Sequence, residues 1–449
     1  MDLQYDKERV MENQPIINVG VIGHVANGKS SIVKILTGKS TQCYSKELER
    51  GITIKLGYAN VKIWKNKNLD NPDCYYSTDS SVKEFICPKT KDKCDLVNHI
   101  SLVDCPGHNM LTSTMLSGAC VMDYTLLVES STNEVIPAPQ TWEHLVATKL
   151  SGIDNSIVCL NKIDREKKKE NIIKKIDDFR EFLKTFDVDK LVIPTSGVFN
   201  ININVLCEFL CNLEVKEKNI NGNPKLLGIR SFDINKPQRI ERNTKLKGGT
   251  IGGSLLEGRL NKGDNIEIYP GYLVSSDNYK MIDDKRVNIK KWSYCPLSAN
   301  VLSIFSEKQE LEYAVPGGLI AVQLDIDPSL LKDDKLAGNI LVKKDTEHNL
   351  KVTNKIEIKI ENIFIDYKTK EEKKIDIKEN NKYKLNINAK ESIGIVNKYD
   401  SEMRVIELTL ETPVVIEIND TKVILGEKNS GDIYAKCNII NIEECTLID

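Results

Sequence analysis

The sequence lacks a long apolar run. No apolar stretch among its 449 residues reaches the roughly 20 residues that a membrane-spanning helix requires. The opening stretch, MDLQYDKERVMENQPI, is acidic and polar and has no apolar core like that of a secretory signal. These absences exclude a protein built on membrane-spanning helices and predict an intracellular, cytoplasmic one.

A surplus of charge of one sign is also missing. The 63 Lys and Arg residues nearly balance the 65 Asp and Glu residues, so the formal net charge is −2. A chain with this balance does not attract polyanions as a whole, and binding to a nucleic acid would require a local basic patch. The content of 40% hydrophobic and 29% charged residues is typical of a soluble globular protein.

A disulfide framework is not indicated. Twelve cysteines are present, but several lie inside apolar runs, among them Cys120, Cys159 and Cys207. In a reducing compartment such residues are small buried hydrophobes. The cysteines therefore predict core positions and not crosslinks.

Residues 17–213 alternate apolar runs with amphipathic stretches. The apolar runs are near-continuous, as strands are when helices cover both faces of a parallel sheet: INVGVIG, HISLVDCPG, YTLLVESS, NSIVCLNK and KLVIPTSG. Helical patterns lie between them, such as KSSIVKILTG and ENIIKKIDDFREFLKTF. This rhythm predicts an α/β domain with a doubly wound, mostly parallel sheet, preceded by an N-terminal extension over residues 1–16.

The pattern changes at residue 214. Residues 214–224, EVKEKNINGNP, are polar with Gly and Pro and predict a linker. Over residues 225–344, short strands with turn signals, such as DNIEIYPG and VLSIFSE, predict an antiparallel β-barrel. Residues 345–449 alternate strongly in KIEIKIENIFI, KYKLNINA, MRVIELTLE and VVIEIND, and predict a second barrel. Three domains agree with the two to four that the length indicates.

The stretch GHVANGKSS, residues 23–31, carries the strongest motif. It matches the phosphate-loop pattern G-x-x-x-x-G-K-[ST], with an apolar strand before it and a helical pattern after it. Glycines let backbone amides curl around phosphate oxygens, and the helix N-terminus adds its dipole. Lys29 would bridge the β- and γ-phosphates, and Ser30 would bind Mg²⁺. The alternative is a glycine-rich turn without a ligand. The predicted phosphate-binding residues of this loop are Asn27, Gly28, Lys29, Ser30 and Ser31.

The stretch NKID, residues 161–164, indicates which base is bound. A carboxylate at Asp164 can accept hydrogen bonds from guanine N1–H and the 2-amino group, and adenine offers neither donor. An unpaired buried charge costs about 1–3 kcal/mol or more, which is enough to select guanine. NKID alone would be a turn sequence, but its distance after the phosphate loop favours a base site. TSG, residues 195–197, would back the base with main-chain amides. The predicted guanine-binding residues are Asn161, Lys162, Asp164, Ser196, Gly197 and Val198.

Two further loops would complete a site for Mg·GTP. In VDCPGH, residues 103–108, Asp104 is placed to hold Mg²⁺ through water, and the Gly107 amide can meet the γ-phosphate. His108 would orient the attacking water as the catalytic residue; the alternative is a surface histidine at a helix start. Thr53, in RGITI, offers a second hydroxyl to Mg²⁺. The predicted magnesium ligands are Ser30, Thr53 and Asp104.

Together these motifs resemble those of the translational GTPases, the elongation factor Tu group. The shared elements are GHVxxGKS, RGITI, VDCPGH and NKID. Longer stretches, such as HISLVDCPGHNMLTSTMLSGACVMDYTLL and LEYAVPGGLIAVQLDIDPSL, narrow the resemblance to the gamma subunits of eukaryotic and archaeal translation initiation factor 2. The resemblance covers residues 17–345 well and the last part of the chain weakly. It implies a G domain followed by two β-barrels.

The resemblance also implies a function. Family members carry initiator methionyl-tRNA to the small ribosomal subunit as GTP complexes and bind an alpha and a beta subunit. They hydrolyse GTP slowly alone and depend on GTPase-activating and nucleotide-exchange partners. Tyr58, in GYAN, falls near the pocket for the aminoacylated tRNA end; the alternative is a core aromatic of a strand. Two other functions stay open: an elongation-type carrier of aminoacyl-tRNA, including the selenocysteine-specific kind, and a nucleotide-binding scaffold without significant hydrolysis.

The sequence departs from the family pattern in the phosphate loop, behind the base and at the C-terminal ending. Asn27 stands where the family often has a His, but phosphate binding rests on the backbone and on Lys29. TSG replaces a Ser-Ala pair behind the base. The ending GEKNSGDIYAKCNIINIEECTLID lacks the basic residues expected of the family. An acidic tail repels phosphates, so we expect weaker contact between the third domain and tRNA.

The cysteines between residues 59 and 99 depart from the family as well. Many members carry a zinc knuckle there, built from Cys-x-x-Cys pairs. Here Cys74, Cys87 and Cys94 are single, and Cys43 or His99 is the candidate for a fourth ligand. A tetrahedral site takes four ligands, so we do not expect zinc. The expected cofactors are GTP or GDP and Mg²⁺.

Overall fold

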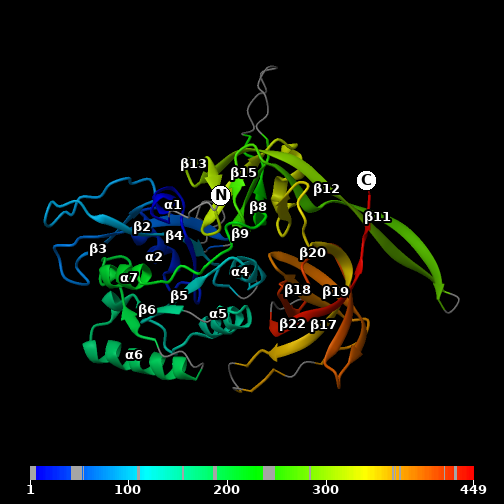
Figure 1. The fold of residues 1–449 in the computed structure, drawn as a ribbon. Coiled ribbons are helices and arrows are strands. Elements are labelled where there is room, and N and C mark those ends of the chain that lie inside the picture. The colour runs from blue at the N-terminus through cyan, green and yellow to red at the C-terminus, as the bar shows by residue number, and fades with distance from the viewer. Residues whose placement is uncertain are drawn as a thin grey trace.

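The computed structural model shows an α/β body and two β bodies packed together (Figure 1). Of residues 156, 277–282 and 285–290 it describes only the backbone. The described residues are 7–41, 53, 55–108, 112–153, 156–185, 190–235, 248–282, 285–366, 369, 371–373, 376–418, 420–428 and 432–448.

The α/β body is built on a seven-stranded sheet with the order β3-β2-β4-β1-β5-β6-β7. The strands are β1 (Ile17–Ile22), β2 (Gly57–Lys65), β3 (Tyr75–Asp79), β4 (Asp95–Asp104), β5 (Tyr124–Ser130), β6 (Ser156–Asn161) and β7 (Val192–Pro194). From β4 to β7 the neighbours are parallel, whereas β2 and β3 run antiparallel at one edge. The predicted doubly wound, mostly parallel sheet is confirmed.

Helices cover both faces of this sheet, which is why all six residues of β1 are buried. One face packs against α1 (Lys7–Asn13), α2 (Lys29–Thr37) and α7 (Ile203–Cys211), and the other against α4 (Thr112–Ala119), α5 (Pro139–Leu150) and α6 (Lys169–Lys184). A short 3-10 helix, η2 (Ile163–Arg165), follows β6. The hydrophobic core on the side of α4, α5 and α6 continues into apolar residues of both barrels. The three bodies therefore share one hydrophobic contact region.

The described part of the N-terminal extension packs against both the G domain and the first barrel. Helix α1 buries Val10 and Met11 against the G domain. Gln14 then joins the first barrel, because its Nε2 donates to the Val315 carbonyl at 2.7 Å and its Oε1 accepts from Val315 N at 3.2 Å. These contacts tie the G domain to the first barrel at its very start.

The first barrel is a six-strand ring closed by the pairing of β11 with β12. In ring order it contains β11 (Asn265–Ile282), β16 (Ile340–Lys343), β8 (Lys225–Phe232), β9 (Thr250–Glu257), β15 (Leu319–Leu324) and β12 (Lys285–Ser306). Smaller elements are β10 (Leu260–Asn261), β13 (Gln309–Leu311), β14 (Tyr313–Ala314), η3 (Pro328–Leu330) and η4 (Lys332–Asp334). The short strands expected at DNIEIYPG and VLSIFSE are parts of β11 and β12, whose pairing continues to Ile282 and Lys285 as a long ribbon (Figure 1).

The second barrel is closed and antiparallel, so the predicted fold class is confirmed for both barrels. Its order is β17 (Lys351–Ile363), β20 (Val405–Ile416), β19 (Lys390–Asp400), β18 (Lys382–Ile387), β21 (Val423–Glu427) and β22 (Ile433–Glu444). The acidic ending is part of this barrel, and the expectation of weaker contact between this domain and tRNA stays a prediction. β22 completes the barrel, and β23 (Thr446–Leu447) pairs with β12 at Ser293 and Tyr294.

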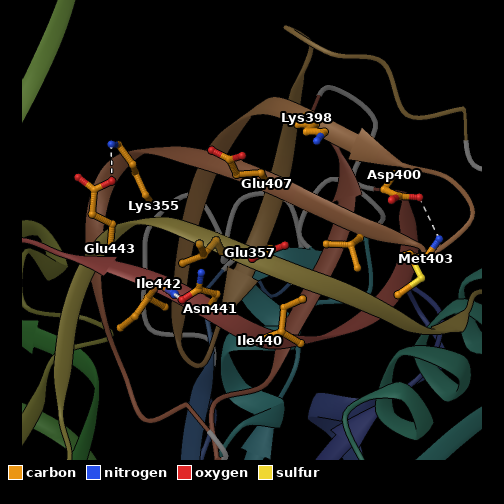
Figure 2. A pocket seen from close by; sticks show the side chains of 12 residues that line it. Lys355, Glu357, Lys398, Asp400, Met403, Glu407, Ile440, Asn441, Ile442 and Glu443 are labelled. Carbon is orange, nitrogen blue, oxygen red and sulfur yellow. Dashed lines mark hydrogen bonds and ion pairs between the residues drawn. The ribbon is translucent and has the colours of Figure 1, made fainter.

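A hollow of about 480 Å³ lies on the outer face of the second barrel. Figure 2 shows its side chains, which come from β17, β19, β20, β22 and the β19–β20 turn, with Lys355 paired to Glu443 at 2.6 Å. None of the residues predicted to bind nucleotide lines it. The nucleotide site therefore has to be sought at the sheet of the G domain. No helix of the described residues is long and apolar enough to cross a membrane.

Candidate GTP site and interdomain cavity

The phosphate loop connects β1 to α2 at the carboxyl edge of the sheet. Its glycines are required by space and backbone geometry. Gly28 has a φ of 92°, and a Cβ there would lie 2.3 Å from Asn161 Nδ2. Gly23 has a φ of 137°, and a Cβ there would lie 2.2 Å from the Val128 carbonyl oxygen. Larger residues would therefore push the loop away from the sheet.

A cavity of about 370 Å³ opens at this loop. Among the predicted site residues, Asn27 does not line it, because its side chain is buried and its Nδ2 donates to the Val128 carbonyl at 2.8 Å. The Asn27 side chain therefore supports the loop from behind, and its predicted contact with phosphate stays a prediction. The lining residues are Val25, Ala26, Gly28, Lys29, Ser30, Ser31, Lys34, Ser40, Thr53, Gly107, His108 and Lys162.

Lys29 is a buried cation held by carbonyl groups. Its Nζ donates to the carbonyls of Gly23 at 2.9 Å and His24 at 3.0 Å. Burial lowers the pKa of Lys29, and the nearby Asp104 opposes this. A Cβ on Gly107 would lie only 2.6 Å from Lys29 Nζ, so the VDCPGH loop touches the phosphate loop directly. A phosphate between these groups would supply the negative charge that a desolvated lysine needs.

The three predicted magnesium ligands meet in one place. Ser30 Oγ donates to Asp104 Oδ2 at 2.6 Å and lies 3.1 Å from Thr53 Oγ1. Thr41, which no motif indicated, donates to the same Asp104 oxygen at 2.6 Å. Hydroxyl and carboxylate oxygens are the hard ligands that Mg²⁺ prefers. The donor set therefore fits the ion, although its binding stays a prediction.

His108 lies at the mouth of the cavity. It is exposed, follows Gly107 directly, and lines the same space as Lys29 and Thr53. The next helix of the described residues, α4, begins at Thr112. A group that orients a water toward the γ-phosphate would have to line this space, and that role of His108 stays a prediction.

The residues predicted to bind guanine lie at or after the ends of the neighbouring strands β6 and β7. Asn161 bridges two loops, because its Nδ2 donates to the Asn27 carbonyl at 3.0 Å and its Oδ1 accepts from Gly197 N at 3.1 Å. The exposed Asp164 accepts a hydrogen bond from Ser196 Oγ at 2.6 Å. The structure thus joins NKID to TSG at the phosphate loop. Lys162 reaches the loop as well, with Nζ on the Ala26 carbonyl, and Val198 beyond it is 73% exposed.

Helix α5 holds the phosphate loop from behind, which the motifs did not indicate. His144 Nδ1 accepts from Gly23 N at 3.1 Å, and Thr141 Oγ1 accepts from His24 N at 3.2 Å. Burial lowers the pKa of His144 to about 3, and the charge of Lys29 adds to this. His144 is therefore neutral at physiological pH and acts as an acceptor.

A second cavity, of about 440 Å³, lies between the G domain and the first barrel. Tyr58 of β2 is partly buried: it lines this cavity and also packs against the hydrophobic core of the G domain, so its role at a tRNA-end pocket stays a prediction. The walls come from β2, β8, β9, β15 and the turn after β12. The lining residues are Tyr58, Asn60, Ile229, Arg230, Phe232, Gly252, Gly253, Glu307, Leu319, Ile320 and Ala321.

The single cysteines after β2 lie in a small apolar cluster. Cys87 and Cys94 are buried beside Trp64, with Tyr76 and Phe85 packed against them. Cys74 is buried elsewhere and contacts the Asn71 side chain at 3.0 Å. Within the described part of the chain there is no group of three or more Cys, His, Asp or Glu side chains that could hold a metal. Cys43 lies outside the described residues, and the expectation of no zinc stays a prediction.

Comparison with known proteins identifies relatives for the whole chain. Residues 14–216 match the family described as elongation factor Tu GTP binding domain. The eukaryotic translation initiation factor 2 subunit gamma of Encephalitozoon cuniculi is 41% identical over 341 residues, which cover 75% of this chain and 74% of that protein. The translation initiation factor 2 subunit gamma of Sulfurisphaera tokodaii is 36% identical over 426 residues, covering 93% and 96%.

Solved structures agree on the fold. A bacterial selenocysteine-specific elongation factor superimposes with a TM-score of 0.68 at 19% identity, over 96% of this chain and 59% of that one. Translation elongation factor SelB from Methanococcus maripaludis gives 0.63 at 21% identity, over 97% and 80%. At these identities the likeness concerns the fold alone. The sequence relatives are closer, and by them the chain belongs to the gamma-subunit family of translation initiation factor 2, a branch of the translational GTPases.

Proposed function

We propose that this chain carries initiator methionyl-tRNA to the small ribosomal subunit in a GTP-dependent manner. The relatives are named as subunits of initiation factor 2, which supports a role as the GTP-binding core of a heterotrimer with alpha and beta subunits. The observation that carries the proposal is the cavity at Tyr58, because one of its walls is β2, the strand that follows Thr53 of the GTP site.

The nucleotide would be held by groups already in place. Backbone amides of residues 28–31 and the Lys29 ammonium would bind the phosphates, while the Asp164 carboxylate would bind guanine, with residues 196–198 behind the base. Ser30, Thr53 and Asp104 would hold Mg²⁺, which when bound neutralises charge on the β- and γ-phosphates. His108 would orient the attacking water.

The second cavity would receive the methionylated tRNA end. Its lining is mostly apolar, with Ile229, Phe232, Leu319 and Ile320, as a pocket for a methionine side chain requires. Because its walls belong to two domains, the pocket exists only while those domains stay together. Release of the γ-phosphate would loosen the loops at Thr53 and Gly107 and so open it.

Two other functions make different predictions. An elongation-type carrier would accept elongator aminoacyl-tRNAs as well as the initiator. A scaffold subunit would bind nucleotide and partner subunits without hydrolysing GTP. GTPase-activating and nucleotide-exchange proteins are proposed partners of the carrier, because such proteins accelerate slow GTPases by about 10³–10⁵-fold.

The deciding experiment measures binding of initiator and elongator methionyl-tRNA to the purified chain by filter retention. It is run with GDP and with a non-hydrolysable GTP analogue. We expect selective binding of the initiator in the GTP form. Equal affinity for both tRNAs would support the elongation-type carrier, and equal affinity in both nucleotide forms would refute GTP-dependent carriage.

A further inference from the structure

Two carboxylates of the first barrel hold the G domain next to the GTP site. The first, Glu307, lies in the turn after β12. Its Oε1 accepts from Asn60 N at 2.6 Å, and its Oε2 accepts from Ser80 Oγ at 2.8 Å. Lys39, directly after the glycine that ends α2, forms ion pairs with both Glu307 and Asp79. These groups are called the Glu307 cluster below.

The second carboxylate, Asp334, ends η4. Lys55 Nζ pairs with its Oδ2 at 3.1 Å, and Arg230 Nε pairs with its Oδ1 at 2.9 Å. Ser231 N donates to the same Oδ1 at 3.0 Å. Burial alone would raise the pKa of Asp334, but these partners hold it below its ordinary value, so the carboxylate is charged. These groups are called the Asp334 cluster.

Both clusters connect the surroundings of the GTP site with the walls of the cavity at Tyr58. On the G-domain side, Lys55 lies two residues after Thr53, a predicted magnesium ligand, and Lys39 follows the end of α2, the helix that begins at the phosphate loop. On the barrel side, Glu307 lines the cavity at Tyr58, and Asp334 orients Arg230, which lines it too. Neither cluster contains a group that would touch the nucleotide.

We propose that Glu307 and Asp334 are positioning residues that couple the GTP site to the interdomain cavity by holding Lys39 and Lys55. This inference rests on the proposed function, because it names the contacts through which GTP would keep the tRNA-end pocket closed. When Thr53 is held in the GTP site, Lys55 is within reach of Asp334, and Asp334 in turn fixes Arg230 in the cavity wall. When Thr53 is released, Lys55 loses its anchored neighbour and its ion pair with Asp334 weakens, so that the Glu307 cluster alone holds the walls together.

The test uses the full chain with Lys39→Met, Lys55→Met and the double substitution. Met keeps most of the aliphatic stem and removes the charge. Lys67→Met is the matched control, since Lys67 pairs with Asp95 at 2.6 Å within the G domain and lies past the end of β2 that is farther from Thr53. Hydrogen exchange at residues 57–61 and 229–232 is compared in GDP and in a non-hydrolysable GTP analogue, without tRNA. The affinity for each nucleotide and for initiator methionyl-tRNA is measured in parallel.

We expect slower exchange at both segments in the GTP form of the wild type and of Lys67→Met. Each single variant should lose about 1.4- to 5-fold of that protection, which corresponds to the roughly 0.2–1 kcal/mol that a partly exposed ion pair contributes, and the double variant should lose most of it. The affinity of each variant for GTP and GDP should stay within about two-fold of the wild type. The ratio of initiator-tRNA affinities in the GTP and GDP forms should fall by a similar factor to the exchange protection.

Two results would overturn the inference: protection in the lysine variants equal to that of the wild type, or a wild type whose exchange does not depend on the nucleotide. A wild type that shows nucleotide-dependent exchange but binds no initiator tRNA would refute the proposed function and leave the coupling through Glu307 and Asp334 supported.

Discussion

Ser30 Oγ lies 2.6 Å from Asp104 Oδ2, although 74 residues separate the two in the chain. The parallel pairing of β1 with β4, which sets Val21 opposite Asp104, brings them together. Because parallel strands end at the same edge of a sheet, a loop after β1 and a carboxylate at the end of β4 share one site. This contact underlies the first prediction.

Replacing Ser30 by Ala should abolish most of the magnesium-dependent part of GTP binding. Hydrogen bonds and ligation that involve charged groups contribute about 1.5–3 kcal/mol, so we expect a loss of roughly 10- to 100-fold in affinity. Titration with a fluorescent GTP analogue, with Mg²⁺ and with a chelator, measures this. Ser117→Ala, whose hydroxyl donates to the Ser113 carbonyl on α4, is the control. Equal chelator sensitivity of Ser30→Ala and wild type would contradict the metal assignment.

Replacing Asp164 by Asn should weaken selection of guanine. The carboxylate that would accept from N1–H and the 2-amino group is lost, and we expect GTP affinity to fall by roughly 10- to 100-fold. Competition between GTP and ATP for the labelled analogue gives the change in preference. The exposed Asp177→Asn on α6 should leave it unchanged. An unaltered GTP-to-ATP ratio in Asp164→Asn would remove Asp164 from the base site.

Replacing His108 by Ala should slow hydrolysis without weakening GTP binding, because His108 lines the cavity but is not part of the Ser30–Asp104 contact. Positioning of a water by a side chain contributes about 10²-fold or more to rate. Single-turnover GTP decay on ribosomal complexes measures the rate, and equilibrium titration measures the affinity. Coincident rates for variant and wild type would favour the scaffold function.

Stability should fall as the pH drops below about 6.5, the ordinary pKa of histidine. Burial lowers the pKa of His144 and of His99 to about 3, so between these values the unfolded chain binds more protons than the folded one. In this range each of the two histidines lowers the free energy of unfolding by about 1.4 kcal/mol for every pH unit of acidification. Urea unfolding at pH 7 and pH 5 measures the loss. His144→Asn keeps an acceptor for Gly23 N but removes the titrating ring, so its free energy of unfolding should depend less steeply on pH. A pH dependence equal to that of the wild type would show that His144 is not held neutral in the folded chain.

The chain purified without added metal should contain no stoichiometric zinc. Cys87 and Cys94 lie in an apolar cluster with Trp64, and Cys74 lies apart from them. Four ligands at one point are the requirement for a structural zinc site. Elemental analysis by mass spectrometry gives the answer directly. One zinc per chain, lost together with stability when Cys87 is replaced by Ser, would contradict this prediction.

The sequence by itself determined the class of each domain and the chemistry of the G domain. The phosphate loop, NKID and VDCPGH are short patterns at strand ends, and their residue types together with their order along the chain were enough to predict a nucleotide site. The alternation of apolar and polar residues was likewise enough to predict two barrels, since side chains on a strand point to opposite faces in turn. Such features need only neighbours in the chain.

Only the tertiary structure decided which distant residues share a site. Thr41 on Asp104, His144 behind Gly23, and the packing of α1 carry no local signal, because each depends on chain segments that meet after folding. The length of the β11–β12 ribbon and the place of β22 in the second barrel depend on strand pairing, which one strand does not encode alone. For the same reason Glu307 and Asp334 became visible as contacts of the GTP site only once the first barrel was placed against the G domain.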